Sequence, residues 1–243
     1  MPHVIFIHGI ANKPVKNELL SLWESAIARS EIGFNLGAQG ITSSLVYWAD
    51  VLYPNPWQGS GLESIGNSYR TAESDDSDIP PKNESEKFIK SLEDRLGYDP
   101  NDKSMDDEIP ELDAPIEEGG FEAIPLPRFI KRRLMKRFVR DVHHYLFNVE
   151  HSPRSGETYQ VRDHIRKLFV DQLKADSNRG GPVIVVAHSM GSVIAYDCLK
   201  NVADCPAVDG LLTIGSPLGL SEVQSELGPG SVSYTHLTLP TKA

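Results

Sequence analysis

Short apolar runs alternate with amphipathic stretches at the two ends of the chain. Four runs are rich in β-branched or large apolar residues, which is typical of strands buried on both faces of a parallel sheet. These runs are 4–7, 44–49, 183–187 and 211–215. Apolar residues recur with helical spacing within 16–30 and 192–203. Strand, helix and strand in this order predict right-handed βαβ units, so we expect an α/β fold with a mostly parallel sheet.

The middle of the chain interrupts this pattern. Acidic residues and prolines crowd 71–122, which is typical of loop, and helical spacing is found within that stretch only at 82–96. A basic amphipathic helix is predicted over 128–147, and a further amphipathic helix over 157–175. Helices between two core strands are expected to form a cap over the functional end of the sheet.

Changes in composition divide the chain into four parts. We expect 1–54 to form the first part of the core, 55–175 a loop and helical cap insertion, and 176–230 the rest of the core. Residues 231–243 have no acidic residue and no periodicity, and they resemble translated vector sequence. We therefore expect this tail to be foreign and the last strand or strands of the sheet to be missing.

Charge and composition exclude several classes of protein. The 243 residues carry a formal net charge of −10, whereas a nucleic-acid-binding protein needs a basic surface. Two cysteines cannot form a four-ligand zinc site, and the adjacent His143 and His144 lack the second cluster of ligands that would support a metal site. We expect no metal and no cofactor. The start of the chain lacks the features of a signal peptide, and no stretch approaches about 20 consecutive apolar residues. We expect a cytoplasmic protein.

The basic helix at 128–147 has two interpretations. Its alternation of basic and apolar residues fits an ordinary solvated amphipathic helix. It also fits a surface that contacts anionic lipid, as in peripheral membrane binding, or the acidic segment of its own chain.

The segment VIVVAHSMGSVIAYD, residues 183–197, carries the clearest chemical signal. A strand, a sharp turn and a helix with small residues two positions before and after a serine form a nucleophile elbow. Here Ala187 and Gly191 flank Ser189. The turn would expose the Ser189 hydroxyl, and the Met190 N–H at the helix start would stabilise an oxyanion.

A second segment, IFIHGI, lies at the end of the first predicted strand. An oxyanion hole needs two donors, and Gly9 lets the backbone approach the serine closely. The Ile10 N–H, or that of Ala11, is the expected second donor. We expect His8 and His188 to support the two loops rather than to transfer protons.

These segments, together with YWAD and TIGSP, resemble the α/β-hydrolase family on its lipase and esterase side. The resemblance covers about half of the chain. It implies a serine hydrolase that cleaves carboxylic esters, small or lipid-like, through an acyl-enzyme on Ser189. The alternative is a non-catalytic binding or scaffold protein on the same fold.

The family also uses an acid and a histidine that follow the serine in the chain. Glu222 and Glu226 are expected to be solvated, and His236 lies in the suspect tail. His143 and His144 precede the serine and are expected to be an ordinary helical pair. We therefore expect this chain to lack the acid and the base, and to be inactive by itself.

Overall fold

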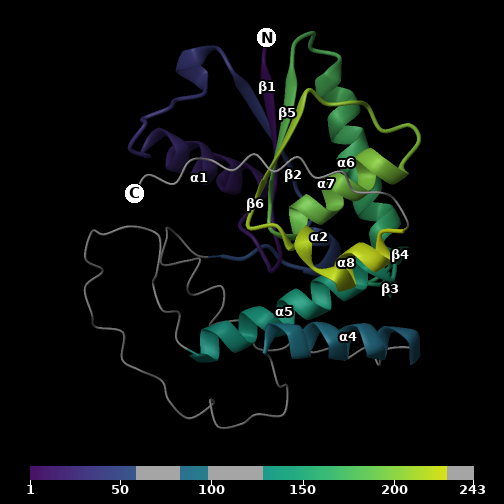
Figure 1. Ribbon diagram of the computed structural model, residues 1–243. Coiled ribbons are helices and arrows are strands. Elements are labelled where there is room, and N and C mark those ends of the chain that lie inside the picture. The colour runs from purple at the N-terminus through teal and green to yellow at the C-terminus, as the bar shows by residue number, and fades with distance from the viewer. Residues whose placement is uncertain (59–82, 98–127, 229–243) are drawn as a thin grey trace.

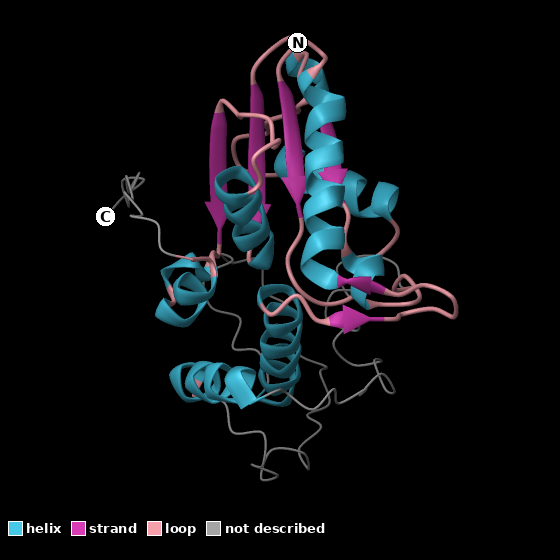
Figure 2. Cartoon of the chain, turned by 90° about the vertical axis from the view of Figure 1, so that its right-hand side faces the viewer, coloured by secondary structure: helices cyan, strands magenta, loops and turns pink. Residues whose placement is uncertain are grey.

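Four apolar runs of the sequence form one parallel sheet. Its strands are β1 (His3–Ile7), β2 (Thr42–Val46), β5 (Val183–His188) and β6 (Gly210–Ile214), in the order β2-β1-β5-β6. Each neighbouring pair runs in the same direction, and helices flank the sheet (Figures 1 and 2). The computed structural model describes residues 1–58, 83–97 and 128–228, and over these the predicted α/β fold is confirmed.

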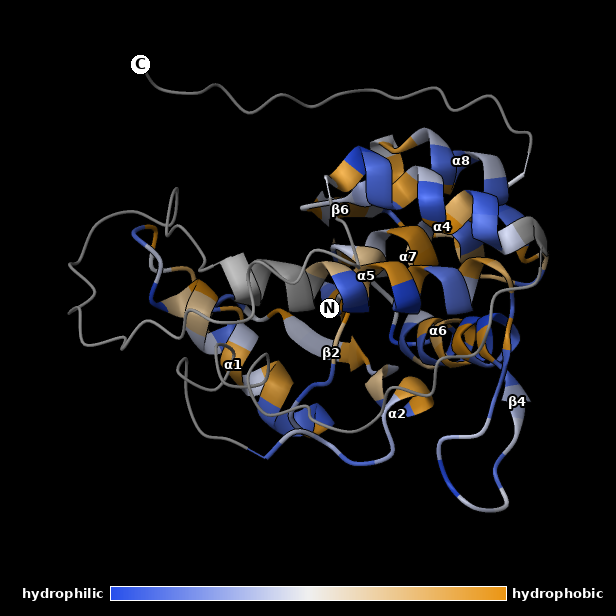
Figure 3. Ribbon diagram, turned by 90° about the horizontal axis from the view of Figure 1, so that it is seen from below, coloured by the Kyte–Doolittle hydropathy of each residue, from blue (hydrophilic) through white to orange (hydrophobic). Residues whose placement is uncertain are grey.

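The two faces of the sheet are covered by different helices. On one face, α1 (Lys16–Ala28) packs its Leu19 against Phe6 and Leu45. On the other face lie α6 (Val161–Ser177) and α7 (Met190–Asn201), which contact each other and bury the main core. The first turns of α7 bury Val193, Ile194 and Ala195, and part of this helix is orange in Figure 3. A 3₁₀ turn, η1 (Gly37–Gln39), precedes β2.

The second strand ends earlier than the sequence predicts. The expected range was 44–49, but β2 spans Thr42–Val46. The reason is that the Trp48 N–H donates to Nε2 of His8 at 3.0 Å instead of to a neighbouring strand. The short helix α2 (Ala49–Leu52) then begins at once.

Helices α4 (Asn83–Leu96) and α5 (Arg128–Leu146) pack together beyond the carboxyl ends of the strands (Figure 1). The Phe88 and Phe147 rings meet edge to face, with centroids 5.2 Å apart. The C-terminal half of α5 is core rather than surface, since Val142 and Tyr145 are fully buried. An ordinary solvated helix therefore does not describe this half.

Two short strands, β3 (Glu150–His151) and β4 (Tyr159–Gln160), form a hairpin before α6. Their presence moves the start of the following helix from the predicted 157 to Val161. We expected this helix to belong to the cap, but Ile165, Phe169 and Leu173 are fully buried in the main core. The core therefore resumes at α6. Most of the acidic stretch 71–122 and the whole tail 231–243 lie outside the described residues.

The last part of the described chain closes over the end of the sheet. A 3₁₀ turn, η3 (Pro217–Gly219), follows β6, and α8 (Ser221–Glu226) follows the turn. In α8, Glu222 accepts from Nε of Arg95 in α4 at 2.8 Å, which links this turn to the cap helices. None of the helices in the described ranges has the length and apolarity needed to cross a membrane.

One face of the sheet carries exposed apolar side chains near its edge. Three large apolar side chains of β5 and β6 are exposed there: Ile184 by 41%, Leu212 by 53% and Ile214 by 49%. In the register of β5 and β6, His188 lies beside Ile214 on this face. Among the described residues β6 is the edge strand of the sheet, so its outer backbone groups have no strand partner there.

Candidate active site

Ser189 lies at the turn between β5 and α7 in a backbone conformation that few side chains adopt. Its φ is 51° and its ψ is −125°, outside the usual helical and extended regions. Strain of this kind persists only where the surrounding structure holds it, and it is common at active sites. Here the Ser189 N–H donates to the Ile214 carbonyl at 2.8 Å, which fixes the turn against the end of β6.

Two glycines allow the segments around Ser189 to approach each other. A Cβ atom on Gly9 would lie 2.8 Å from the Ser189 Cβ. A Cβ atom on Gly191 would lie 2.7 Å from the carbonyl oxygens of both Ile7 and His8. Such distances are far below van der Waals contact, so only glycine fits at either position. Ala187, on β5, is fully buried.

His8 supports the loop after β1 and does not reach the serine pocket. Its ring is fully buried and stacks on Trp48, with centroids 4.8 Å apart. Nδ1 donates to the Gly9 carbonyl at 2.8 Å, while Nε2 accepts from the Trp48 N–H. Burial, with a smaller contribution from Lys13, lowers the pKa of His8 to about 3, so the ring is neutral at pH 7.

The loop after β1 offers one free backbone donor near the serine. The Ala11 N–H donates to Oδ2 of Asp141 at 2.9 Å and is therefore occupied. Of the two expected donors, this leaves the Ile10 N–H for an oxyanion. Met190 is the first residue of α7, where an N–H has no acceptor within its own helix. Met190 directly follows Ser189 in the chain, and Ile10 lines the same pocket as Ser189.

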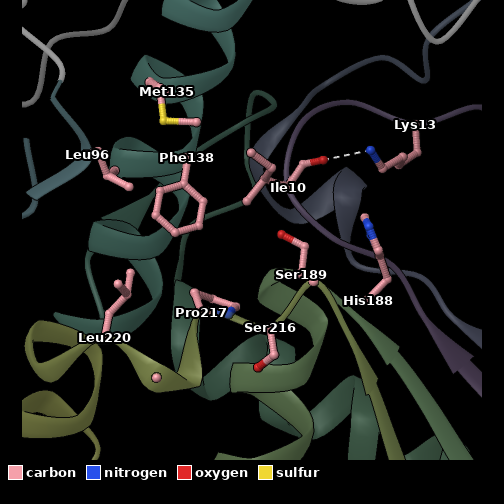
Figure 4. Close-up of a pocket in the computed structure, with 12 residues that line it drawn as sticks. Ile10, Lys13, Leu96, Met135, Phe138, His188, Ser189, Ser216, Pro217 and Leu220 are labelled. Atoms are coloured by element: carbon pink, nitrogen blue, oxygen red, sulfur yellow. Dashed lines mark hydrogen bonds between the residues drawn. The ribbon is translucent and has the colours of Figure 1, made fainter. Parts of the chain in front are cut away.

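The Ser189 side chain faces a cavity of about 420 Å³. Cap helices and the turn after β6 form most of its walls (Figure 4). The lining residues are Ile10, Lys13, Leu96, Met135, Phe138, His188, Ser189, Gly215, Ser216, Pro217, Gly219 and Leu220. Apart from Lys13, His188 and the two serines, these residues are apolar or glycine. A volume in this range suits a small-molecule ligand.

The described residues place no acid–histidine pair beside Ser189. His188 is the one described histidine that lines the pocket, and its ring points toward Lys13 and away from the serine hydroxyl (Figure 4). His143 and His144 lie further along α5, buried to 6% exposure, with the His143 ring stacked on Phe147. Burial lowers the pKa of His144 to about 4.

The carboxylates considered from the sequence also lie away from the pocket. Glu222 accepts hydrogen bonds from Ser91 and Arg95, and Glu226 does not line the pocket. His236 lies outside the described residues. Within the described ranges, no group of three or more metal-ligating side chains is found.

Three polar residues of this region were not singled out from the sequence: Lys13, Asp141 and Ser216. Lys13 lines the pocket, and burial lowers its pKa to about 8 although Asp141 acts in the opposite direction. Ser216 shares a hydrogen bond of 2.6 Å with Ser192. Asp141 lies 130 residues from the amide that it binds, so no local pattern could reveal it. The sequence gives only a weak indication of a role for Lys13, which lies three residues after Ile10 of the predicted oxyanion loop.

Comparison with known proteins adds no relative: no family model, no curated protein and no solved structure matches this chain.

Proposed function

We propose that this protein is a serine hydrolase that cleaves carboxylic esters through an acyl-enzyme on Ser189. The observation that carries the proposal is the strained Ser189 at a strand-to-helix turn, facing a mostly apolar pocket. In the proposed reaction the serine oxygen attacks the ester carbonyl, the C–O bond to the alcohol breaks, and the serine proton leaves with the alcohol. Water then cleaves the acyl-enzyme, which releases the carboxylic acid and restores the serine hydroxyl. The Ile10 and Met190 N–H groups stabilise the oxyanion of the tetrahedral intermediate. The motifs around both loops resemble the α/β-hydrolase family, which supports the same reaction.

The pocket favours an ester with an apolar acyl group. Leu96, Met135 and Phe138 come from the cap helices, and Pro217 and Leu220 from the turn after β6. Burying an apolar chain against these side chains stabilises the complex by about 25 cal/mol per Å² of apolar surface. A short or medium acyl chain fits a cavity of about 420 Å³.

Turnover also requires a base, and none is placed beside Ser189 by the described residues. In serine hydrolases that have lost their triad, the oxyanion hole and substrate binding alone still accelerate the reaction about 10³–10⁴-fold over water. Labelling by a reactive probe requires no turnover, but it still requires the serine to lose its proton. Because the described residues place no base beside Ser189, we expect slow labelling that accelerates as the pH is raised and hydroxide takes that proton.

The test is labelling of the protein by a fluorophosphonate that carries a fluorophore. We expect one label per chain, and we expect Ser189→Ala to remove it. Ser216→Ala is the matched control, because Ser216 lines the same pocket but does not lie on the elbow. This variant should still be labelled. Labelling that survives Ser189→Ala would reject the proposal, and absence of any label would favour the non-catalytic binding protein.

A further inference from the structure

The peptide group between Ile10 and Ala11 is held at both ends by charged side chains. Its carbonyl oxygen accepts from Nζ of Lys13 at 2.6 Å, a bond drawn in Figure 4. Its N–H donates to Oδ2 of Asp141 at 2.9 Å. The cation thus lies at the negative end of the peptide dipole and the carboxylate at its positive end. Hydrogen bonds to charged groups are about twice as strong as neutral ones.

The Asp141 carboxylate is itself fixed in place. It is fully buried, and it accepts from the Tyr53 hydroxyl at 3.0 Å and from Arg140 at 3.1 Å. Burial, together with Asp141, holds the pKa of Tyr53 well above its ordinary value, so the phenol stays protonated and continues to donate. A buried charge with this many partners holds one position, because losing any partner is costly.

The loop needs such support because its backbone is strained. Ala11 has a φ of 69°, in the left-handed region that costs a residue with a Cβ atom about 1–2 kcal/mol. If the Ile10–Ala11 peptide group turned over, ψ of Ile10 and φ of Ala11 would change together and Ala11 could relax. The Ile10 Cα atom joins this peptide group to the Gly9–Ile10 peptide group, whose N–H is the oxyanion donor in the proposed function.

We propose that Lys13 and Asp141 are positioning residues for the oxyanion loop: by holding the Ile10–Ala11 peptide group they fix the Ile10 Cα atom, and so keep the adjoining Gly9–Ile10 peptide group and its N–H in place beside Ser189. This inference rests on the proposed function. It also joins the loop to the cap, because Asp141 belongs to α5, which contributes Met135 and Phe138 to the pocket. The cap helix therefore forms a wall of the pocket and fixes the oxyanion hole.

The experiment compares two isosteric variants of buried aspartates. Asp141→Asn removes the charge that accepts from Ala11. Asp197→Asn is the matched control, because Asp197 is also buried and also binds one tyrosine, Tyr145, and one arginine, Arg166, but it does not touch the loop. For each variant, fluorophosphonate labelling is measured against probe concentration, which separates the maximal labelling rate from the probe affinity.

A misplaced oxyanion donor lowers the maximal rate and leaves the pocket intact. We expect Asp141→Asn to lower the maximal labelling rate about 10- to 100-fold with little change in probe affinity. Asp197→Asn should lower stability without changing that rate. Lys13→Met, which removes the hydrogen bond to the Ile10 carbonyl and also changes one wall of the pocket, should lower the maximal rate as well. If Asp141→Asn fails to fold, Lys13→Met still tests the positioning role.

Hydrogen exchange at the Ala11 amide gives a readout that does not depend on activity. The exchange should accelerate in Asp141→Asn and stay slow in Asp197→Asn. Normal maximal labelling rates in both Asp141→Asn and Lys13→Met would overturn the positioning role of these two residues and leave the proposed function standing. Equal losses in the two aspartate variants would overturn the positioning role as well, because they would indicate general destabilisation. A wild-type protein without a label on Ser189 would instead reject the proposed function.

Discussion

Replacing Gly191 with alanine tests how closely α7 approaches β1. The new Cβ atom would lie 2.7 Å from the carbonyl oxygens of Ile7 and His8, whereas carbon–oxygen contacts in proteins are about 3.3–3.6 Å. Both are backbone oxygens, one from the last residue of β1 and one from the residue that follows it, so no flexible side chain can yield. Overpacking of this kind costs about 1–3 kcal/mol, occasionally more. Alanine gains up to about 1 kcal/mol of helix propensity, and less in a first turn.

We therefore expect Gly191→Ala to lower the free energy of unfolding by about 1–3 kcal/mol, measured by urea denaturation. The displaced helix start would also move the Met190 N–H, so the fluorophosphonate labelling rate should fall about 10-fold or more. Gly37→Ala is the control, because the nearest atom to its added Cβ lies at an ordinary 3.5 Å. A Gly191→Ala protein as stable and as reactive as the wild type would refute the close approach.

Two further predictions concern stability and the exposed apolar side chains of the sheet. Lowering the pH from 7 to 5 should reduce the free energy of unfolding, because burial lowers the pKa of His8 to about 3 and that of His144 to about 4 from 6.5. The stability that the neutral rings contribute is complete above about pH 6.5 and is lost as the pH falls toward the lowered pKa values. Equal urea midpoints at pH 7 and pH 5 would contradict this prediction. Leu212→Lys should change the free energy of unfolding by less than about 0.5 kcal/mol, because Leu212 is 53% exposed. It should lower light scattering from concentrated protein by placing a charge on an exposed apolar edge, and undiminished scattering would count against this.

The strands and the elbow could be predicted because their signals are local. A buried parallel strand is a short apolar run, and the turn at Ser189 requires small residues at fixed offsets. Both Ala187 and Gly191 meet this requirement. The close contact of Gly191 in α7 with the end of β1 agrees with the elbow pattern.

The errors arose where distant contacts decide the local structure. β2 ends at Val46 because the His8 ring takes the Trp48 N–H, and a sequence window around β2 does not contain His8. The amphipathic pattern of α6 predicts an apolar face, but it does not predict whether that face packs within the cap insertion or in the main core beside the sheet. Asp141 looked like one residue in a basic helix, yet its carboxylate is buried against a loop 130 positions away.

The central claim is that Ser189 is the nucleophile, and locating the phosphonate adduct tests it most directly. Protein treated with an equimolar fluorophosphonate would be digested, and the modified residue identified by tandem mass spectrometry. The strained turn and the mostly apolar pocket both lie at the Ser189 hydroxyl, so the adduct is expected on Ser189 alone. An adduct on Ser216, on Lys13 or spread over several serines would contradict the account.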